Sequence, residues 1–411
     1  MVPYELYDLA LAFKKVKLWQ KLMDSQLFAV RHSDGTTGYC CVMGMLGEHC
    51  ALAVYPGEAG LNSCRKMFID DPDLDVFDKH ELNFSQDCVM VSYQLKGALN
   101  KREVAEVNAY MAERALKLRG KNAYPQFERF RPNCYPWRLS DAADQLHLRE
   151  ALEAALDVAA KLQYATPEQL GFTEGTLFER AIPLLEREGD AFRWSALELP
   201  APWQEAYVSP FIGDELSLAR IGKSKKRSGS WDCSIFLHIK PASDEVEQGA
   251  DIDELEEAPY FPYLLMIVDD GSGMVLDMEI FRSFDDLDAL CQAVVRFVLD
   301  AGRPTQILVA DDRTQAFFRN IASQLGVKLV RRRELPALDE AKQGLAEHFA
   351  SSDGVAPARD VEATLELLSD PAIYSDLPDE VLTMLRRGVQ AGALPEDIAR
   401  MVERECSRRG L

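Results

Sequence analysis

Apolar residues recur along the first part of the chain in patterns typical of helices and strands. In residues 4–23 they fall at steps of three and four, which predicts an amphipathic helix. Short apolar runs follow up to residue 94, and turn pairs such as Asp34-Gly35 and Pro56-Gly57 separate them. Apolar runs divided by turn residues are typical of a small antiparallel sheet.

Two capped helices are predicted next. Asn100 stands before one periodic stretch, and Ser140 stands before a long stretch rich in alanine and leucine. We therefore expect an α+β N-terminal domain with an antiparallel sheet over residues 1–165. Residues 166–205 look helical but interrupted and end in a proline-rich stretch, so we expect a helical connector there.

The second part of the chain alternates strand and helix patterns. The predicted elements are strands at about 215–222, 231–239, 262–269 and 273–281, a helix over 283–302, a strand over 306–310, a helix over 313–325, a strand over 327–330 and a helix over 338–349. We expect an α/β domain with a mixed sheet over 206–350, followed by a helical tail over 351–411. Residues 244–257 carry eight carboxylates and are expected to form a solvated loop.

Charge is distributed unevenly along the chain. Residues 1–140 carry 18 Lys and Arg against 17 Asp and Glu, whereas the remaining residues carry 28 against 50. The acidic part repels polyanions, which argues against nucleic acid or an anionic membrane as a partner. No apolar run approaches the roughly 18 residues of a membrane span, and no signal-peptide pattern opens the sequence, so we expect a cytoplasmic protein.

Motifs for cofactors are missing from the sequence. The nine cysteines show no C-x-x-C spacing, which argues against a structural zinc site, and their odd number argues against a disulfide framework. The glycine motifs that cradle nucleotide phosphates do not occur either. We therefore expect no cofactor.

The order of elements over 231–349 resembles the ribonuclease-H-like fold, in particular its integrase and transposase branch. Trp231-Asp232, the stretch 263–271 (YLLMIVDDG) and the stretch 307–312 (ILVADD) carry the resemblance. The resemblance implies an enzyme that cuts or joins nucleic-acid strands with two divalent ions, Mg or Mn, held by three carboxylates. Asp232 matches the first of these carboxylates, and Asp311 or Asp312 matches the second.

The third carboxylate is not placed by the sequence. Glu347 follows Asp311 with 35 residues between them, a spacing typical of that branch. However, Glu347 lies about 180° from the apolar stripe of its predicted helix, so it would point to solvent. Arg313 also puts a cation where metal would bind. The acidic pairs Asp269-Asp270 and Asp311-Asp312 suit a turn and a helix start, where carboxylates accept from free amides.

We therefore favour a non-catalytic binding or interaction module with an unknown protein or small-molecule partner. The alternative is a divalent-metal-dependent nuclease or strand-transfer enzyme that uses Asp232, Asp311 and an unplaced third carboxylate. A third interpretation is a small-ligand sensor with its pocket between the domains.

A segment between the predicted helices interleaves basic and aromatic residues. Its candidates for a nucleic-acid or ligand contact are Arg119, Lys121, Arg129, Arg131 and Trp137. Guanidinium groups pair with phosphates, and aromatic rings stack on bases. The competing interpretation is a proline-stiffened connector that packs its aromatic rings onto the N-terminal sheet, and we favour it.

The whole chain also resembles a bacterial family of two-domain proteins built from two domains of unknown function. The resemblance rests on phrases such as 38–44 (GYCCVMG), 52–55 (LAVY), 120–125 (GKNAYP) and 135–137 (YPW). It implies a bacterial, two-domain protein and supplies no activity.

Overall fold

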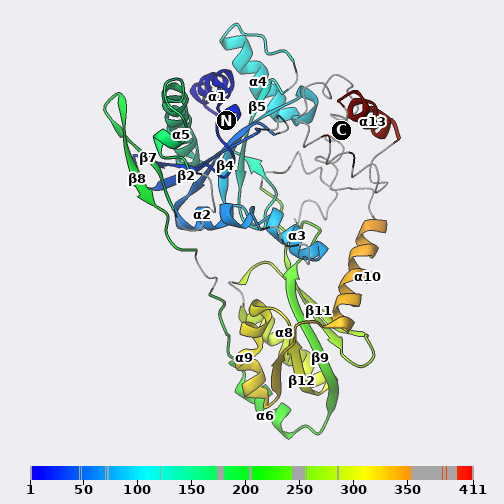
Figure 1. Cartoon of the computed structure of the whole chain (residues 1–411). Helices are drawn as coiled ribbons and strands as arrows, with labels where there is room; N and C mark the ends of the chain where they lie inside the picture. The colour runs from blue at the N-terminus through cyan, green and yellow to red at the C-terminus, as the bar shows by residue number, and fades with distance from the viewer. Residues whose placement is uncertain are drawn as a thin grey trace. The chain divides into compact units, whose positions relative to one another are not determined.

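The structure is a computed structural model of the whole chain (Figure 1). It describes residues 2–45, 47, 49–69, 71, 74–120, 122–173, 180–202, 206–242, 255, 257–284, 287–352, 382, 386 and 396–409. The chain divides into two compact units, Met1–Lys342 and Gln343–Leu411. The first unit contains one sheet of eight strands and one of five.

The eight-stranded sheet has the order β6-β5-β4-β3-β2-β1-β7-β8. Its strands are β1 (Phe28–Arg31), β2 (Thr37–Met43), β3 (Ala51–Pro56), β4 (Cys88–Gln94), β5 (Tyr124–Phe130), β6 (Trp137–Arg138), β7 (Ala181–Glu188) and β8 (Ala191–Glu198). All neighbours are antiparallel except β1 and β7, which run parallel with Val30 opposite Leu185. The prediction of an antiparallel sheet was therefore wrong, because β7 follows a long crossover and can return beside β1 in the same direction.

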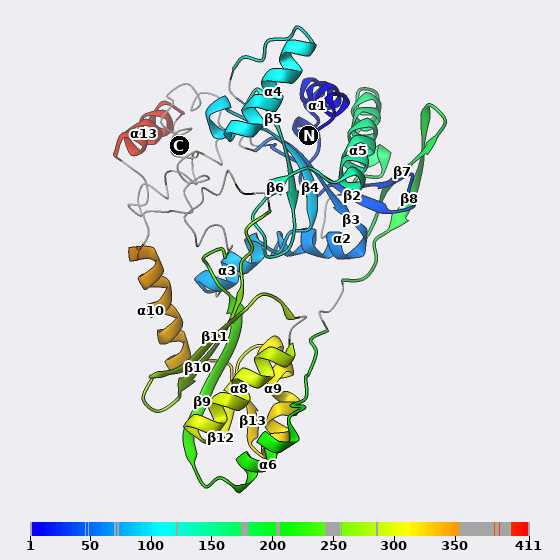
Figure 2. The same cartoon turned by 180° about the vertical axis from the view of Figure 1, so that it is seen from behind.

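Helices cover both faces of this sheet (Figures 1 and 2). The helices are α1 (Tyr4–Val16), α4 (Lys101–Glu113) and α5 (Ala142–Lys161) on one face and α2 (Gly57–Lys66) on the other. Along β3, Leu52 and Val54 join the core under α1 and α5, whereas Ala53 and Tyr55 join the core under α2. A strand buried on both faces reads as a continuous apolar run, as the sequence does here.

Side-chain caps fix the beginnings of two helices. The prediction that Asn100 caps a helix is confirmed: its Oδ1 accepts from the Glu103 amide and Glu103 Oε2 accepts from the Asn100 amide, both at 2.9 Å. Ser140 was predicted to cap the next helix, but Asp141 does so, accepting from the amides of Ala143 and Asp144. A carboxylate also complements the positive end of the helix dipole.

The expectation of a helical connector over 166–205 was wrong where the structure describes strands. Residues 181–198 form the β7–β8 hairpin, whose turn contains Gly189 at φ 62°. Glu186 lies seven residues before Arg193, a spacing that also suits a helix, but Glu186 and Glu188 both pair with Arg193 across the hairpin. Cross-strand ion pairs therefore explain charges that the sequence pattern assigned to a helix.

Residues 215–222, predicted as a strand, also form a helix instead. Helix α6 (Glu215–Lys223) begins where the Asp214 carboxylate accepts from the Ser217 amide at 2.9 Å. Ser217 and Ile221 are its buried residues, and their spacing of four places them on one face. The short apolar pattern fits either structure, and the cap decides for the helix.

The five-stranded sheet has the order β11-β10-β9-β12-β13. Its strands are β9 (Arg227–Leu237), β10 (Tyr263–Asp269), β11 (Val275–Phe281), β12 (Arg303–Val309) and β13 (Lys328–Arg331), and its helices are α6, α8 (Leu287–Ala301), α9 (Asp312–Leu325) and α10 (Pro336–Ser352). Strand β10 runs antiparallel to β9 and β11, whereas β12 runs parallel to β9 and β13. The prediction of a mixed sheet in this half is confirmed.

Each face of the five-stranded sheet packs against a different layer. Side chains of α8 and α9 share a core with Trp231 and Ile235 of β9. On the opposite face, Phe236 contacts the ring of Phe77 from α3 (Val76–Asn83), and Lys342 Nζ lies 4.9 Å from the centre of the Phe236 ring. Even-numbered residues of β9 therefore face α3 and the start of α10.

Direct contacts join the two sheets within the first unit. The Arg313 guanidinium pairs with both carboxylate oxygens of Glu81 on α3 and lies over the ring of Tyr263. The Asn133 amide group donates to the Tyr263 hydroxyl at 2.8 Å. Arg313 is therefore held by Glu81 and by aromatic rings, because a buried guanidinium needs a paired carboxylate.

The rest of the chain is described only in part. In the tail, α13 (Glu396–Arg409) confirms a helix. The predicted acidic loop, 244–257, lies outside the described residues except for Leu255 and Glu257. Among the helices that the structure describes, none has the length and apolar character needed to cross a membrane.

Candidate functional site

Asp232 lies at the centre of the five-stranded sheet. It stands on β9 between Val268 of β10 and Leu308 of β12. Its side chain is fully buried, and neither carboxylate oxygen has a hydrogen-bond partner within the described part of the chain. Burial, together with the negative charge of Asp270, raises the pKa of Asp232 to about 6. Burial of an ionised carboxylate without a partner is costly, which is the physical reason for the raised pKa.

Other charged groups surround Asp232. The charges of Asp269, Asp270 and Asp339 raise its pKa further, whereas the charge of Arg332 lowers it. Arg332 Nη1 lies 3.3 Å from Asp270 Oδ1. Asp269 Oδ1 accepts from two amides of the β10–β11 turn, at 2.9 Å each. The cluster therefore combines acids with a fixed guanidinium, and one of the acids closes a turn.

Asp311, the second predicted metal ligand, caps α9. Its carboxylate accepts from the Thr314 amide at 2.7 Å and from the Thr314 hydroxyl at 2.8 Å. The same hydroxyl accepts from the Ile235 amide of β9, so the cap also ties the helix to the sheet. Both oxygens of Asp311 are thus engaged in the helix start.

The remaining acids of the predicted centre lie elsewhere. Asp312 pairs with Arg331, and Glu347 is exposed on α10, where it accepts from the Gln343 amide group. Within the described residues, no group of three or more His, Cys, Asp or Glu side chains is placed to hold a metal ion. The residues beside Asp232 therefore do not fit a two-ion centre, since one is a cation and Asp311 serves as a cap.

The basic and aromatic segment is part of the first sheet. Arg129 on β5 pairs with Asp87 at 2.6 Å and with Asp144 at 3.2 Å, and only 12% of its side chain is exposed. Arg131 Nη2 lies 3.9 Å from the same Asp144 carboxylate, and Trp137 on β6 stands opposite Arg129. The structure thus brings these three candidates together around carboxylates that already balance the charge of Arg129.

The other two candidates of this segment are not part of that group. Arg119 is exposed in the loop before β5, and Lys121 lies outside the described residues. A contact of this segment with nucleic acid or another ligand stays a prediction.

A network of two histidines and two carboxylates lies between α5 and the β1–β2 hairpin. His32 Nδ1 lies 2.9 Å from Glu150 Oε2, and His147 Nε2 lies 2.8 Å from Asp34 Oδ2. The two imidazole rings stack with their centres 4.3 Å apart. His32, His147 and Glu150 are all buried. Each histidine therefore has its own carboxylate, and the rings pack against each other.

This network lowers the pKa values of His32, Glu150 and Asp34, for different reasons. Burial and the neighbouring His147 lower the pKa of His32. Burial pushes the pKa of Glu150 upward, but hydrogen bonds from Ser33 and His32 outweigh it and leave the pKa low. The hydrogen bond with His147 lowers the pKa of Asp34 to about 2. The folded state therefore favours ionised carboxylates beside a neutral His32.

The sequence offered only a weak signal for this network. His147 and Glu150 are three residues apart on α5, among the buried residues Leu148, Ala151 and Leu152. Polar residues in a buried stripe usually have a partner, which could have flagged this pair. The partners Asp34 and His32 lie far away in the sequence, so their spacing carries no signal.

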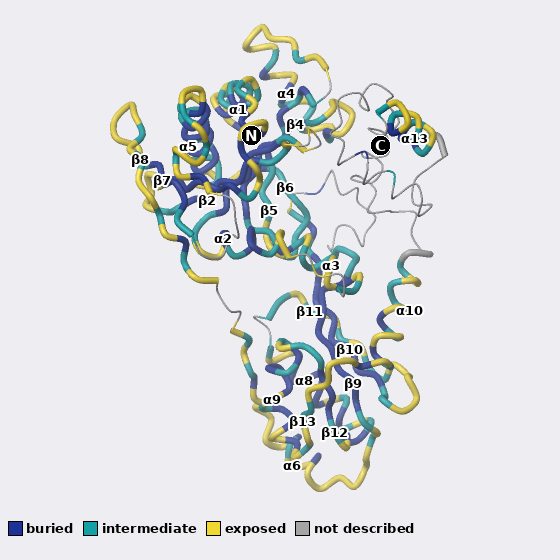
Figure 3. Tube along the Cα trace, in the orientation of Figure 1, coloured by how far each residue is buried: buried dark blue, intermediate teal, exposed yellow. Residues whose placement is uncertain are grey.

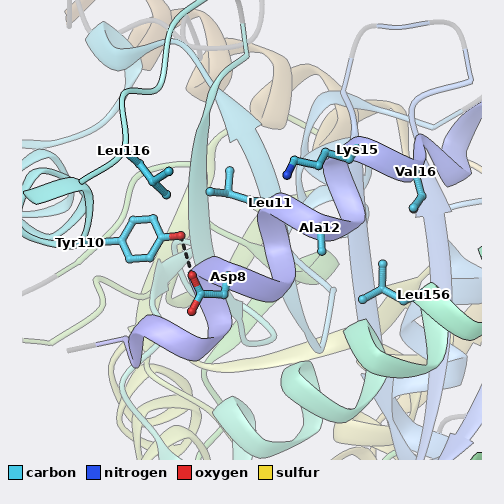
Figure 4. Close-up of a pocket in the computed structure, with 8 residues that line it drawn as sticks. All are labelled: Asp8, Leu11, Ala12, Lys15, Val16, Tyr110, Leu116 and Leu156. Atoms are coloured by element: carbon cyan, nitrogen blue, oxygen red, sulfur yellow. Dashed lines mark hydrogen bonds between the residues drawn. The ribbon is translucent and has the colours of Figure 1, made fainter. Parts of the chain in front are cut away.

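An open groove of about 390 Å³ runs along α1 (Figure 4). It is lined by Asp8, Leu11, Ala12, Lys15, Val16, Tyr110, Leu116 and Leu156. The Asp8 carboxylate accepts from the Tyr110 hydroxyl at 2.9 Å and pairs with Arg114 at 2.7 Å. Most of the lining is aliphatic and its carboxylate is already engaged, so the groove offers apolar contact rather than chemistry.

Two family models match the chain, one over six strands of the first sheet and one over the second sheet. Residues 4–180 match the family described as Domain of unknown function (DUF7309), which spans β1–β6, and residues 217–346 match the family described as Domain of unknown function (DUF6930), which spans β9–β13. No curated protein and no solved structure matches the chain significantly. The predicted pairing of two such domains is confirmed. The chain is therefore a two-domain protein that joins DUF7309 and DUF6930, two domains of unknown function.

Proposed function

We propose that the chain is a non-catalytic binding or interaction module whose second domain has a ribonuclease-H-like fold. The element order supports this fold: three strands precede α8, and β12, α9, β13 and α10 follow in turn. The sheet order supports it too, because β9 is central and β10 alone runs against the other strands. A fold by itself assigns no activity, so the proposal depends on the residues of the site.

Arg332 is the observation that carries the non-catalytic proposal. Its guanidinium pairs with Asp270 at a partly exposed position, and its charge acts on Asp232, so a cation already balances part of the acidic cluster. A divalent ion held by Asp232 and Asp270 would be repelled by this positive charge. Recruiting Asp311 would also remove a helix cap worth about 1 kcal/mol.

A divalent-metal-dependent nuclease or strand-transfer enzyme is the second candidate. The unpartnered, buried carboxylate of Asp232 favours it, because such groups cluster at functional sites. Mg or Mn would supply Lewis-acid chemistry there. Arg332 and the capping role of Asp311 argue against such a centre, and we derive no reaction from it.

Strand cleavage separates these two candidates. The full chain would be incubated with labelled single- and double-stranded DNA and RNA in Mg²⁺ or Mn²⁺, beside Asp232→Asn and the control Asp300→Asn, an exposed acid of α8. We expect no cleavage above the level of Asp232→Asn. Cleavage by the wild type that survives in Asp300→Asn and disappears in Asp232→Asn would overturn the proposal.

The same proposal includes the source, the location and the partner class of the protein. We propose a bacterial, cytoplasmic protein whose partner is a protein or a small molecule rather than nucleic acid or a membrane. The formal charge of −21 supports this choice, because such a surface repels polyanions.

A further inference from the structure

Strand β11 is the outer strand of the five-stranded sheet. Within the described residues, β10 is its only neighbour, so the backbone groups on its other side are unpaired. The opposite edge strand, β13, has four residues, whereas β11 has seven. A long exposed edge is a template for another extended segment.

One face of β11 carries exposed apolar side chains. Met278 is 48% exposed and stands opposite Met266, and Ile280 is 62% exposed and stands opposite Leu264. Met274, before the strand, is 61% exposed. Figure 3 shows the region of the β10–β11 turn as exposed, in yellow. A run of exposed apolar side chains along one strand is more than the scattered exposure normal for a surface.

The other face of β11 carries two acids. Asp277 and Glu279 stand opposite Ile267 and Leu265, whose side chains lie in the core under α8. Arg296 of α8 lies 3.7 Å from Glu279. The charge of Arg296 also acts on Asp277, so among the described residues these two carboxylates face one guanidinium and keep a net negative charge. Cross-strand pairs of opposite charge stabilise a sheet, and this charge therefore favours a basic neighbour.

The same acids disfavour a second copy of β11 as the neighbour. Antiparallel pairing centred on Met278 would set Asp277 against Glu279 of the other copy. Pairing centred on Asp277 would set Asp277 against Asp277 of the other copy, and pairing centred on Glu279 would do the same for Glu279. Like charges directly opposite are destabilising, so these registers are disfavoured.

We propose that the free edge of β11 binds an extended segment of another protein in which basic and apolar residues alternate. Its Lys or Arg side chains would lie beside Asp277 and Glu279, and its apolar side chains beside Met278 and Ile280. The segment would add a sixth strand to the sheet through backbone hydrogen bonds. This inference rests on the proposed binding function and names its partner class.

The test uses the full chain and a fluorescein-labelled peptide that repeats Lys-Val four times. Fluorescence anisotropy would compare the wild type with the double variant Asp277→Lys/Glu279→Lys. The control Asp288→Lys/Asp300→Lys changes the net charge equally, at exposed positions of α8. We expect saturable binding that weakens about tenfold in the β11 variant and little in the control.

Two modified peptides distinguish strand addition from general ionic attraction. A peptide with Glu in place of Lys should not bind. One with every backbone nitrogen methylated should lose binding, because neither of its edges can donate hydrogen bonds to the sheet. Equal affinity of the β11 variant and the control, or undiminished binding of the methylated peptide, would overturn the inference.

Circular dichroism would show whether the variants fold. If the double reversal unfolds, Asp277→Asn/Glu279→Gln replaces it, with an expected loss of about threefold. Nucleic-acid cleavage that depends on Asp232 would refute the proposed function and leave the peptide result intact. Absent peptide binding without cleavage would refute only the β11 site.

Discussion

Glu150 in the first domain and Asp232 in the second are both buried carboxylates, and their surroundings have opposite effects. Glu150 accepts from the Ser33 amide at 3.1 Å and lies 2.9 Å from the His32 ring nitrogen, and its pKa is low. Among the described residues Asp232 has no hydrogen-bond partner, and its pKa rises to about 6. Burial pushes both pKa values upward, and hydrogen-bond partners reverse the effect only at Glu150.

Glu150 and Asp232 therefore have opposite effects on the free energy of unfolding. A carboxylate whose folded pKa is lowered stabilises the fold above its unfolded pKa. A carboxylate whose folded pKa is raised destabilises the fold increasingly as pH rises from its unfolded pKa through its folded pKa. Glu150 therefore stabilises the fold at neutral pH, and Asp232 destabilises it.

The largest effect is expected from breaking the paired acid. Glu150→Ala should lower the free energy of unfolding by about 2–3 kcal/mol, because it leaves the buried, neutral His32 ring without its hydrogen-bond partner. Chemical denaturation at pH 7 measures this loss. The control Glu188→Ala, an exposed acid at the end of β7, should change stability by less than about 0.5 kcal/mol. Similar values for the two variants would contradict the structural role of Glu150.

The unpaired acid should respond in the opposite direction. Asp232→Asn should raise the free energy of unfolding at pH 8 by about 1–3 kcal/mol, since about two pKa units correspond to about 3 kcal/mol at most. The gain should shrink as pH falls from about 6 toward 4, where the wild-type carboxyl becomes protonated. Denaturation curves across this range provide the measurement, and a destabilised variant at pH 8 would show that Asp232 has a partner.

Asp311 should behave as a cap rather than as a ligand. Asp311→Ala should cost about 0.5–2 kcal/mol, because Thr314 loses both of its hydrogen bonds to the carboxylate. Asp311→Asn keeps a capping oxygen and should lose less. Thermal unfolding of both variants without added metal tests this order, and equal losses would contradict it.

The smallest effect concerns the pH dependence of the histidine network. The pKa of His32 is lowered on folding, so its contribution is complete above the ordinary imidazole pKa and declines as pH falls below about 6.5. The Asp232→Asn background removes one carboxyl whose raised pKa acts in the opposite direction. Because burial also lowers the pKa of His80, this background is compared with Asp232→Asn/His32→Asn. Stability should decrease more steeply from pH 7 to pH 5 where His32 is present, and equal slopes would mean that His32 is not held neutral.

Local signals explain most of the fold that the sequence predicted. The N-cap at Asn100 and the apolar runs of β2–β4 need only neighbouring residues, and both were recognised. The β7–β8 hairpin was not, because Glu186 pairs with Arg193 across strands in a spacing that also suits a helix.

The candidate site was predicted only in part. Asp232 stood out through its resemblance to a known first-strand position. The roles of Arg332 and His32 depend on contacts between distant segments, which periodicity does not encode. Arg332 reaches the acidic cluster from the end of β13, and His32 meets α5 only after the sheet has formed.

Calorimetric titration with Mn²⁺ tests the central claim most directly. The full chain, Asp232→Asn and Arg332→Ala would be titrated at pH 7.5 with millimolar Mn²⁺. If Arg332 balances the negative charge around Asp232, neither the wild type nor Asp232→Asn will bind Mn²⁺ with a saturable heat. Stoichiometric binding by the wild type that disappears in Asp232→Asn would contradict the account and restore the metal-dependent enzyme.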